Sequence, residues 1–355
     1  MSTIEIISCD PGRYISFCRD IYRDDPFFRD SGLTNVLRMI FYGREPCFRQ
    51  AEITPVMVGR NGEILAACLL ITDQSQPDML QFSYFEARED CQPAVDLLMA
   101  VAVNLCKKKG MPRIVIGLDS MVGVLVDRFD CMPCYGSRYN PAYYPEYLGK
   151  YGAREYLLAS YLLELHRDIL AREQKILKRL GKRFTCRTAS WRHLGREAAI
   201  YTYLKNRCFT GQPFFTTGST EVNHRMFSSY HTLMSGHNLL ILERGGAPAG
   251  YLLWFPDYNQ LLTPGDVMDQ DTCRRYRMRG HEIDKLTISE IGVLPEYQGS
   301  GAILVLFDYF LQLTGGSYDW CETGWILNEN IKSKGFGIRW ADSEYKHYKI
   351  FEIEV

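Results

Sequence analysis

The chain has 355 residues, of which 46% are hydrophobic and 23% charged, a balance typical of a globular protein rather than a disordered one. Its formal net charge of −1 provides no field that would attract the whole surface to nucleic acid or anionic lipid, so we expect neither partner. The densest basic run, REQKILKRLGKR at 172–183, has the pattern of a solvated helix face.

Other sequence features indicate the compartment and exclude several site types. No stretch approaches the roughly 18 uninterrupted apolar residues of a membrane span, and the opening MSTIEIISCDPGRY lacks the pattern of a signal peptide. Twelve dispersed cysteines are typical of buried thiols in a reducing compartment, so we expect a cytoplasmic protein. The pair CMPC (131–134) lacks a second ligand pair, and the seven histidines lack metal-binding spacing, so we expect no metal site.

The first half of the chain predicts a mixed α/β pattern. A helix over 11–25 follows Asp10, a suitable N-cap. A hairpin centred on 60–73 precedes a strand at 79–87, a helix at 93–110 and a buried strand at 112–119. A further strand is expected at 154–165.

The second half repeats this order. RGGAPAGYLLWFPD (244–257) aligns without a gap on RNGEILAACLLITD (60–73), and both predict hairpins. The elements that we expect in this half are a charged helix at 166–182, a helix pair at 195–209 and 220–236, a polar insertion at 258–283 that could cover a cleft, a strand at 284–295, a helix at 301–316 and strands at 317–323 and 345–355.

A glycine turn opens the predicted helix at 301–316. The stretch QGSGAI (298–303) lies where a strand runs into a helix, and there backbone N–H groups can converge on an anion. Two glycines can also serve only the sterics of a tight turn, so both interpretations stay open. The chain contains no P-loop motif, and the turn lacks the third glycine of the dinucleotide fingerprint.

The segment GVLPEYQGSGA (292–302) resembles motif A of the GNAT superfamily, the acyl-CoA N-acyltransferases. The chain as a whole is similar to bacterial tandem-GNAT proteins, with shared features in IYRDDPFF (21–28), YNPAYYPEY (139–147) and WILNENI (325–331). The resemblance implies an α/β (α+β, mixed-sheet) fold with two tandem GNAT-like domains, residues 1–165 and 166–355, each a mostly antiparallel mixed sheet flanked by helices.

The resemblance places an acyl-CoA site in the C-terminal half. The residues that it assigns to the cofactor are Ile291, Gly292 and Val293 for the pantetheine arm, Gln298, Gly299, Ser300, Gly301, Ala302 and Ile303 for the pyrophosphate, and Asn328 and Asn330 for further contacts. Ile303 stands where the family prefers Gly or Ala, and the two asparagines could instead cap a helix. The corresponding FEAREDCQPAVDLL (85–98) has no glycine between strand and helix and carries acidic residues, so we expect the N-terminal half to bind no CoA.

Acyl transfer to an amine needs a base and a donor for the developing oxyanion. Glu290 is the candidate base, because strand alternation places it on one face with Leu286 and Ile288 just before the glycine turn. Such a carboxylate either faces the cleft or pairs structurally. The family often uses a tyrosine as general acid four residues before a Gly-Phe pair, but here Ile331 holds that place.

The sequence therefore predicts an N-acetyltransferase that transfers an acyl group from acetyl-CoA, or another acyl-CoA, to an amine of a small molecule or peptide. The alternative is a non-catalytic acyl-CoA-binding or interaction protein on the same scaffold. A third hypothesis, a Fem-type peptidyltransferase that uses aminoacyl-tRNA, is disfavoured by the near-neutral charge and the lack of a basic tRNA-binding arm.

Overall fold

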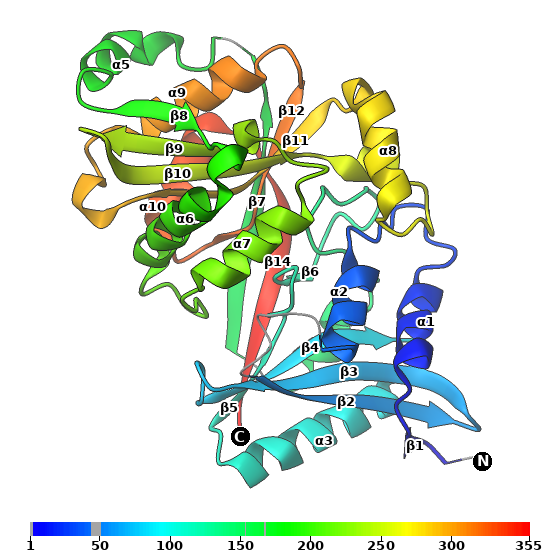
Figure 1. Ribbon diagram of the computed structural model, residues 1–355. Helices are drawn as coiled ribbons and strands as arrows, with labels where there is room; N and C mark the ends of the chain where they lie inside the picture. Colours follow the sequence, from blue (N-terminus) through cyan, green and yellow to red (C-terminus); the bar gives the residue numbers. More distant parts are fainter. Residues whose placement is uncertain (1–2, 44–50, 153, 167) are drawn as a thin grey trace.

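The computed structural model describes residues 3–43, 51–152, 154–166 and 168–355. Figure 1 shows two lobes, a lower one formed by the N-terminal half and an upper one formed by the C-terminal half, with two long strands running between them. The strands of the N-terminal half are β1 (Glu5–Ile7), β2 (Ala51–Arg60), β3 (Glu63–Asp73), β4 (Met79–Ala87), β5 (Arg113–Ile116), β6 (Val124–Leu125) and β7 (Arg154–Glu164). Its helices are α1 (Pro11–Ile21), α2 (Leu33–Phe41), α3 (Gln92–Lys109) and α4 (Tyr144–Gly149).

The C-terminal half repeats the order of hairpin, strand, helix and parallel strand. Its strands are β8 (Thr185–Thr188), β9 (Leu239–Arg244), β10 (Ala247–Pro256), β11 (Lys285–Val293), β12 (Trp320–Thr323), β13 (Ile326–Leu327) and β14 (Ser343–Glu354). Its helices are α5 (Gln174–Leu180), α6 (Leu194–Phe209), α7 (Thr220–Ser229), α8 (Gln270–Arg279), α9 (Ala302–Thr314) and α10 (Ile331–Trp340). The repeat predicted from the two hairpins is confirmed.

Local signals account for most of these elements. The Asp10 side chain accepts a hydrogen bond from the Arg13 amide at 2.8 Å, so the predicted N-cap of α1 is confirmed. The helix expected at 166–182 is shorter in the structure, because a 3₁₀ turn at Ala171–Glu173 precedes α5.

The polar insertion expected at 258–283 is not a simple surface loop. It begins with a 3₁₀ turn, η5 (Tyr258–Leu261), in which Tyr258 and Asn259 are fully buried. An Asp269 capping box then starts α8. The insertion therefore contributes to the core as well as to the surface. Its many charged residues had indicated a surface segment only.

The sheet is continuous through both halves, in the order β1-β2-β3-β4-β5-β14-β7-β12-β11-β10-β9-β8. Strand β14, the last of the chain, lies between β5 and β7 of the N-terminal half. Strand β7 in turn pairs with β12 of the C-terminal half. Each half thus ends in a strand that pairs with the parallel strand of the other half. The boundary that we expect at residue 165 stays a prediction, and these two strands cross it.

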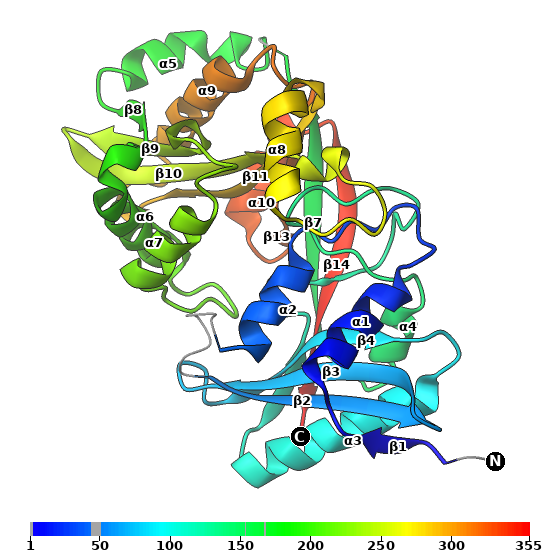
Figure 2. The same cartoon turned by 45° about the vertical axis from the view of Figure 1, so that its right-hand side comes forward.

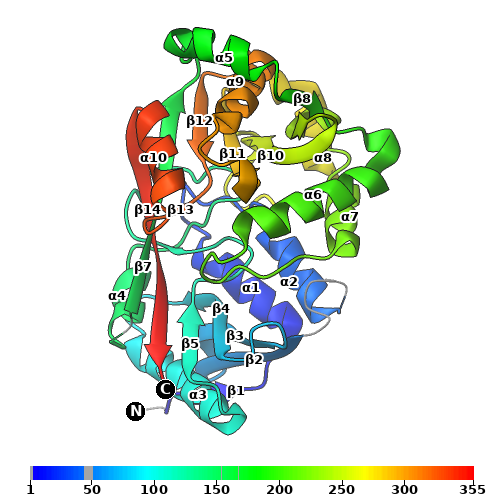
Figure 3. The same cartoon turned by 90° about the vertical axis from the view of Figure 1, so that its left-hand side faces the viewer.

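Helices cover both faces of the sheet in each lobe. In the lower lobe α3 packs on one face, and α1 and α2 pack on the other. In the upper lobe α9 packs on one face, and α6 and α7 pack on the other. Figures 2 and 3 show these layers, with β7 and β14 running from one lobe into the other and the C-terminus at the far end of the lower lobe. Among the described residues, no helix is long and apolar enough to cross a membrane.

The exchange of terminal strands predicts that the N-terminal half does not fold by itself. A fragment of residues 1–165 lacks β14, so β5 and β7 would each lose a neighbouring strand and expose unpaired backbone groups. We expect this fragment to show no cooperative thermal unfolding transition, whereas the full chain does. Circular dichroism melting measures both, and a cooperative transition in the fragment would contradict the expectation.

Candidate functional site

Two parallel strands of the C-terminal half pair over only part of their length. Strand β11 pairs with β12 from Lys285 to Ile288, and the Gly324 amide then donates to the Ile288 carbonyl at 2.7 Å. Beyond this point β11 continues to Val293 on β10, but no strand in the described part of the chain pairs with its other edge. We call this divergence the C-terminal fork. The backbone edge of Ile291–Val293, which the family resemblance assigns to the pantetheine arm, lies along it.

A β-bulge lies at the base of this fork. Leu253 of β10 faces Glu290 and Trp254 faces Ile288, so Ser289 is an extra residue on β11. Ser289 is exposed. An added Cβ at Gly324 would approach the Ser289 carbonyl oxygen to 2.8 Å, so the close approach of the two strands here requires a glycine.

The bulge corrects one expectation about Glu290. Simple alternation predicts that Glu290 shares a face with Leu286 and Ile288, but these two pack toward α9. The extra residue reverses the alternation, and the Glu290 side chain instead contacts Tyr201 of α6 on the opposite face. Glu290 therefore lies beside the helix pair α6–α7.

The Glu290 carboxylate has three hydrogen-bond donors. The hydroxyls of Tyr201 and Tyr251 each donate to Oε2 at 2.8 Å, and Lys205 Nζ lies 2.6 Å from Oε1. Burial raises the pKa of Glu290, but the Lys205 charge and the three hydrogen bonds outweigh it and hold the pKa below its ordinary value. The geometry favours structural pairing, one of the two roles that the sequence left open, and it weakens Glu290 as a base.

The glycine turn follows β11 and opens α9. Gly299 and Gly301 have φ of +73° and +83°, a conformation that favours glycine, and Gly301 is the N-cap of α9. An added Cβ at Gly299 would meet nothing within 4 Å, whereas one at Gly301 would lie 2.8 Å from the Leu180 side chain of α5. The first amides of α9, including those of Ala302 and Ile303, begin a helix whose N-terminal N–H groups lack intrahelical acceptors.

Three polar or basic side chains, Gln298, Ser300 and Lys332, lie at this turn. Gln298 Nε2 donates to the Val293 carbonyl at 3.3 Å, and Lys332 Nζ donates to Gln298 Oε1 at 2.8 Å. The Ser300 hydroxyl donates to the Tyr297 carbonyl at 2.6 Å. A lysine beside a helix N-terminus adds positive charge where an anion would bind.

The two asparagines that the resemblance assigns to the cofactor lie at the start of α10. Asn330 is the N-cap of this helix, and its side chain accepts from the Ser333 amide. The Asn328 side chain contacts Lys334. Ile331, where the family often has a tyrosine, is 80% exposed. The capping role left open for Asn330 is confirmed.

The N-terminal half contains a corresponding fork, but its own side chains fill it. Strand β4 pairs with β5 only as far as Phe82 and continues to Ala87. There the Tyr144 hydroxyl accepts from the Ala87 amide at 2.7 Å, and the Tyr143 hydroxyl donates to the Ala87 carbonyl at 2.8 Å. Tyr147 does the same for the turn before α3, accepting from the Cys91 amide at 2.9 Å. The free volume left in this fork is about 10 Å³, about one water molecule.

A cavity of about 90 Å³ lies beside the C-terminal fork, between the two halves. Ser289 and Gly324 of the fork form part of its wall. The other side consists of residues 135–138, which follow β6 in the N-terminal half, and of Tyr348 on β14. The fork therefore opens toward a space that both halves enclose.

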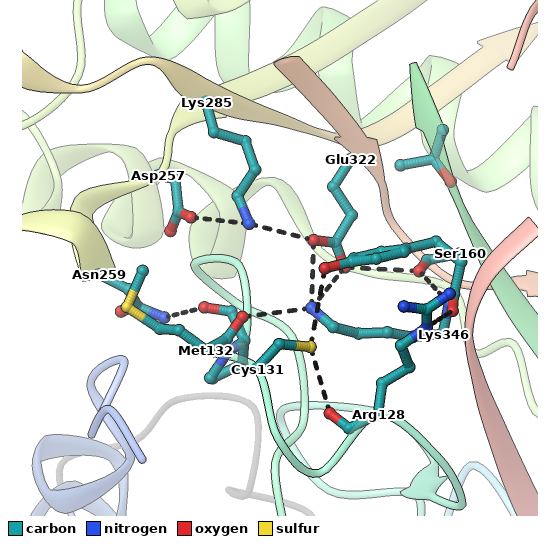
Figure 4. A network of polar contacts seen from close by, with 12 residues as sticks. Arg128, Cys131, Met132, Ser160, Asp257, Asn259, Lys285, Glu322 and Lys346 are labelled. Carbon is teal, nitrogen blue, oxygen red and sulfur yellow. Dashed lines mark hydrogen bonds and ion pairs between the residues drawn. The ribbon is translucent and has the colours of Figure 1, made fainter. Parts of the chain in front are cut away.

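A buried network of four charges lies near this cavity (Figure 4). Lys346 Nζ lies 3.1 and 3.2 Å from the two carboxylate oxygens of Glu322, and Lys285 Nζ lies 3.4 Å from Glu322 and 3.3 Å from Asp257. The Lys346, Glu322 and Asp257 side chains are at most 1% exposed. The network joins β14 to β12 and β11, which lie on the other side of β7 in the sheet. Its charges balance, which buried ionised groups require.

Sequence reasoning missed several of these residues. The partners of Glu290 come from α6 and β10, and Lys346 and Glu322 are brought together by the exchange of β14. Lys346 gave no local signal for a buried ion pair, because its strand SEYKHYKIFEIE carries other charged residues, and its partner could not be identified without the topology. Among the described residues, no group of three or more His, Cys, Asp or Glu side chains could hold a metal ion.

By sequence, the chain matches no protein-family model and no curated protein. Solved structures match over nearly its whole length. A tandem GNAT protein from the clavulanic acid biosynthesis pathway superposes with a TM-score of 0.59 at 13% identity, covering 99% of this chain and 98% of that one. The chain has the tandem GNAT fold.

Two further GNAT structures agree with this assignment. A GCN5-related N-acetyltransferase from Sphaerobacter thermophilus gives a TM-score of 0.53 at 14% identity and covers 99% of this chain and 95% of that one. A GNAT-family acetyltransferase from Colwellia psychrerythraea gives 0.50 at 8% identity, with 99% of both chains covered. Identities this low establish the fold of this chain and leave its substrate to be inferred from its own residues.

The partners of Glu290 predict an acid-dependent loss of stability. Because folding lowers the pKa of this carboxyl below its ordinary value of 4.5, its contribution is fully present above that value and is lost as the pH falls through the folded pKa. We expect Glu290→Gln to lower the unfolding free energy by about 1–3 kcal/mol at pH 7, with the difference shrinking as the pH falls below 4.5. Urea unfolding at several pH values measures it.

The matched control for this experiment is Glu296→Gln. Glu296 is 43% exposed and pairs with Arg207 on the surface at 3.3 Å, an arrangement that contributes about 0–1 kcal/mol. The expectation for Glu290 is wrong if the two variants lose the same stability at pH 7, or if the Glu290→Gln difference does not shrink in acid.

Proposed function

We propose that this chain is an acyl-CoA-dependent N-acyltransferase whose CoA site is the C-terminal fork together with the glycine turn at 298–303. The observation that carries the proposal is the contrast between the two forks. The N-terminal fork is filled by Tyr143 and Tyr144, whereas the C-terminal fork leads from an unpaired strand edge to the N-terminus of a helix. The shared GNAT fold supports the reaction class.

The residues of the glycine turn fit a pyrophosphate. Gly299 carries no side chain over the turn, and a Cβ there would point into open space. The helix dipole and the N-terminal amides of α9 favour a negative group, and Lys332 lies against the adjacent Gln298. In this proposal CoA, when bound, supplies the acyl thioester. The chain holds the pantetheine arm along Ile291–Val293 and the phosphates at residues 298–303.

The chemistry asked of the chain is mainly positioning. Holding an amine next to a thioester converts a bimolecular step into a unimolecular one and supplies a large part of the acceleration. Backbone N–H groups of Ile291 or Val293 are the proposed donors to the developing oxyanion. Glu290 is the proposed acceptor of the amine proton, although its lowered pKa limits the driving force for this step.

The second candidate is a non-catalytic acyl-CoA-binding protein. Two observations favour it: the Glu290 carboxylate already has three donors, and Ile331 stands exposed where the family often has a tyrosine. Both candidates require the same CoA site, so binding tests what they share. Release of the CoA thiol in the presence of an amine distinguishes them.

The glycine turn predicts how a single charge affects acetyl-CoA binding. Ser300→Glu places a carboxylate at the start of α9, which suits the helix dipole and the fold but repels a bound phosphate. We expect the acetyl-CoA Kd to rise at least about tenfold, equivalent to about 1.4 kcal/mol. Isothermal titration calorimetry measures the Kd, and thermal unfolding monitors the fold.

Ser300→Gln is the matched control, because it has the same size as the glutamate without its charge. We expect its Kd to stay much closer to that of the wild type. Equal affinity in all three proteins would exclude the glycine turn as the phosphate site. Absence of acetyl-CoA binding by the folded wild type would overturn the proposed function altogether.

A further inference from the structure

Two segments beside the glycine turn carry a concentrated positive charge. Residues 172–183, which include α5, and residues 331–340, which form α10, contain nine lysines and arginines but a single acidic residue, Glu173. The whole chain has a net charge of −1, so positive charge is segregated onto this part of it. Glu173 pairs with Arg339 at 3.0 Å, and the other eight basic residues have no acidic partner within the two segments. We call these two segments the basic surface.

The basic surface begins at the glycine turn. Leu180, at the end of α5, lies against Gly301, and Lys332, in the first turn of α10, donates to a side chain of the glycine turn at 2.8 Å. At the opposite ends of the two helices, Glu173 contacts Arg339. Figure 3 shows α5 above α9 and α10 to its left. The surface therefore borders the N-terminus of α9 and extends away from it along two helices.

Exposed isoleucines lie among these charges. Ile176 of α5 is 48% exposed, and Ile331 and Ile338 of α10 are 80% and 60% exposed. Ile331 and Ile338 are seven residues apart, so they lie on one face of α10. Apolar side chains interleaved with charges suit contact with another protein, which would bury the isoleucines and pair acidic groups with the lysines and arginines.

The charge of the basic surface exceeds what CoA alone can balance. CoA carries roughly four negative charges, about two on its pyrophosphate and about two on its phosphomonoester, against the eight basic residues without an acidic partner. The charges are also spread out. Lys175 precedes Leu180 by five residues, roughly 7 Å along the helix, and Arg339 follows Lys332 by seven residues, roughly 10 Å. The charges farthest from the glycine turn therefore suit a larger anionic molecule.

A partner at this position has two properties to match. It needs an acidic face for the lysines and arginines, because opposite charges steer two surfaces together and fix their orientation. Since the basic surface begins at the proposed phosphate site, the partner also needs a phosphate-linked arm that reaches the C-terminal fork. Acyl carrier proteins combine both properties. They are small acidic proteins that hold an acyl group as a thioester on a phosphopantetheine arm, the same arm that CoA contains.

We propose that the basic surface binds an acyl carrier protein, whose phosphopantetheine arm passes the glycine turn and enters the C-terminal fork. This inference rests on the proposed function and adds a second acyl donor to it. In the transfer, the amine nitrogen forms a bond to the acyl carbon, and the bond from that carbon to the sulfur of the arm breaks. The thiolate of the arm takes a proton, and the amine loses one.

The experiment measures the binding of two probes to the full chain by calorimetry. The probes are acetyl-CoA and a bacterial acyl carrier protein acetylated on its arm, and we expect the wild type to bind both. The carrier-protein Kd should rise at least about fivefold as salt increases from about 50 to about 200 mM, because salt screens the charges of exposed groups. The same carrier protein without its arm should bind at least about tenfold more weakly, because it makes only one of the two contacts.

Charge reversal tests the basic surface. Arg172→Glu combined with Lys175→Glu changes two exposed positions at the end of the surface that is remote from the glycine turn. We expect the carrier-protein Kd to rise at least about tenfold, while the acetyl-CoA Kd changes less than about twofold. Lys107→Glu combined with Lys108→Glu, at two exposed positions of α3 in the lower lobe, is the matched control and leaves both Kd values unchanged. Thermal unfolding monitors the fold of each variant.

A second variant tests the apolar part of the surface. Ile338→Asp places a negative charge where an isoleucine is expected to be buried by the carrier protein, and we expect the carrier-protein Kd to rise at least about tenfold with the acetyl-CoA Kd unchanged. Met278→Asp is the matched control, because Met278 is 67% exposed and lies on α8, away from the basic surface. It should bind both probes as the wild type does.

The outcomes separate this inference from the proposed function. If acetyl-CoA binds and the acetylated carrier protein does not, or if reversal at Arg172 and Lys175 leaves the carrier-protein Kd unchanged, the basic surface is not its docking site, and the acyltransferase proposal stands. Binding of the wild type to phosphatidylserine-containing vesicles or to duplex RNA in place of the carrier protein likewise overturns the inference. If acetyl-CoA does not bind to the wild type, the proposed function fails and the inference fails with it.

Discussion

The exchange of β7 and β14 is the constraint on which the rest of the structure depends. Strand β14 enters the lower lobe between β5 and β7, and β7 continues into the upper lobe beside β12. This pairing decides which residues of the two halves meet beside the site. It brings Tyr348 and Lys346 to the boundary between the halves, and it fixes the distance from the C-terminal fork to residues 135–138.

The two halves share one backbone arrangement, a fork between parallel strands, but differ in what lies in the fork. In each, a parallel strand pair ends early and leaves the longer strand with an unpaired edge. Unpaired backbone groups in a folded protein need partners. The N-terminal half provides them from its own chain, through the hydroxyls of Tyr143, Tyr144 and Tyr147. In the C-terminal half no strand of the described residues pairs with the corresponding edge of Ile291–Val293, which is the proposed CoA site, and a glycine turn follows it.

The sequence predicted the repeated elements and the glycine turn well, because both depend on local rules. Hydrophobic periodicity located β4 and α9 to within about two residues. The rule that successive side chains of a strand point to opposite faces gave the wrong face for Glu290, because the rule assumes a strand without bulges. The bulge at Ser289 has no local sequence signature. The exchange of terminal strands was also out of reach, because pairing between residues far apart in sequence is set by the tertiary fold.

The buried charges explain why the cavity wall adjacent to the fork keeps its shape. Isolated lysine and glutamate side chains are costly to bury, and Lys346 and Glu322 offset much of that cost only by pairing with each other. Once fixed, Lys346 donates to the Met132 carbonyl at 3.3 Å, Asp257 accepts from the Tyr135 amide at 2.8 Å, and Asn259 donates to the Pro133 carbonyl at 3.0 Å. Three hydrogen bonds from the C-terminal half thus hold one short loop of the N-terminal half. This loop carries Ser137 and Arg138. A buried pair of this kind adds little net stability, so its main effect is geometric: it sets the position of that loop relative to the fork.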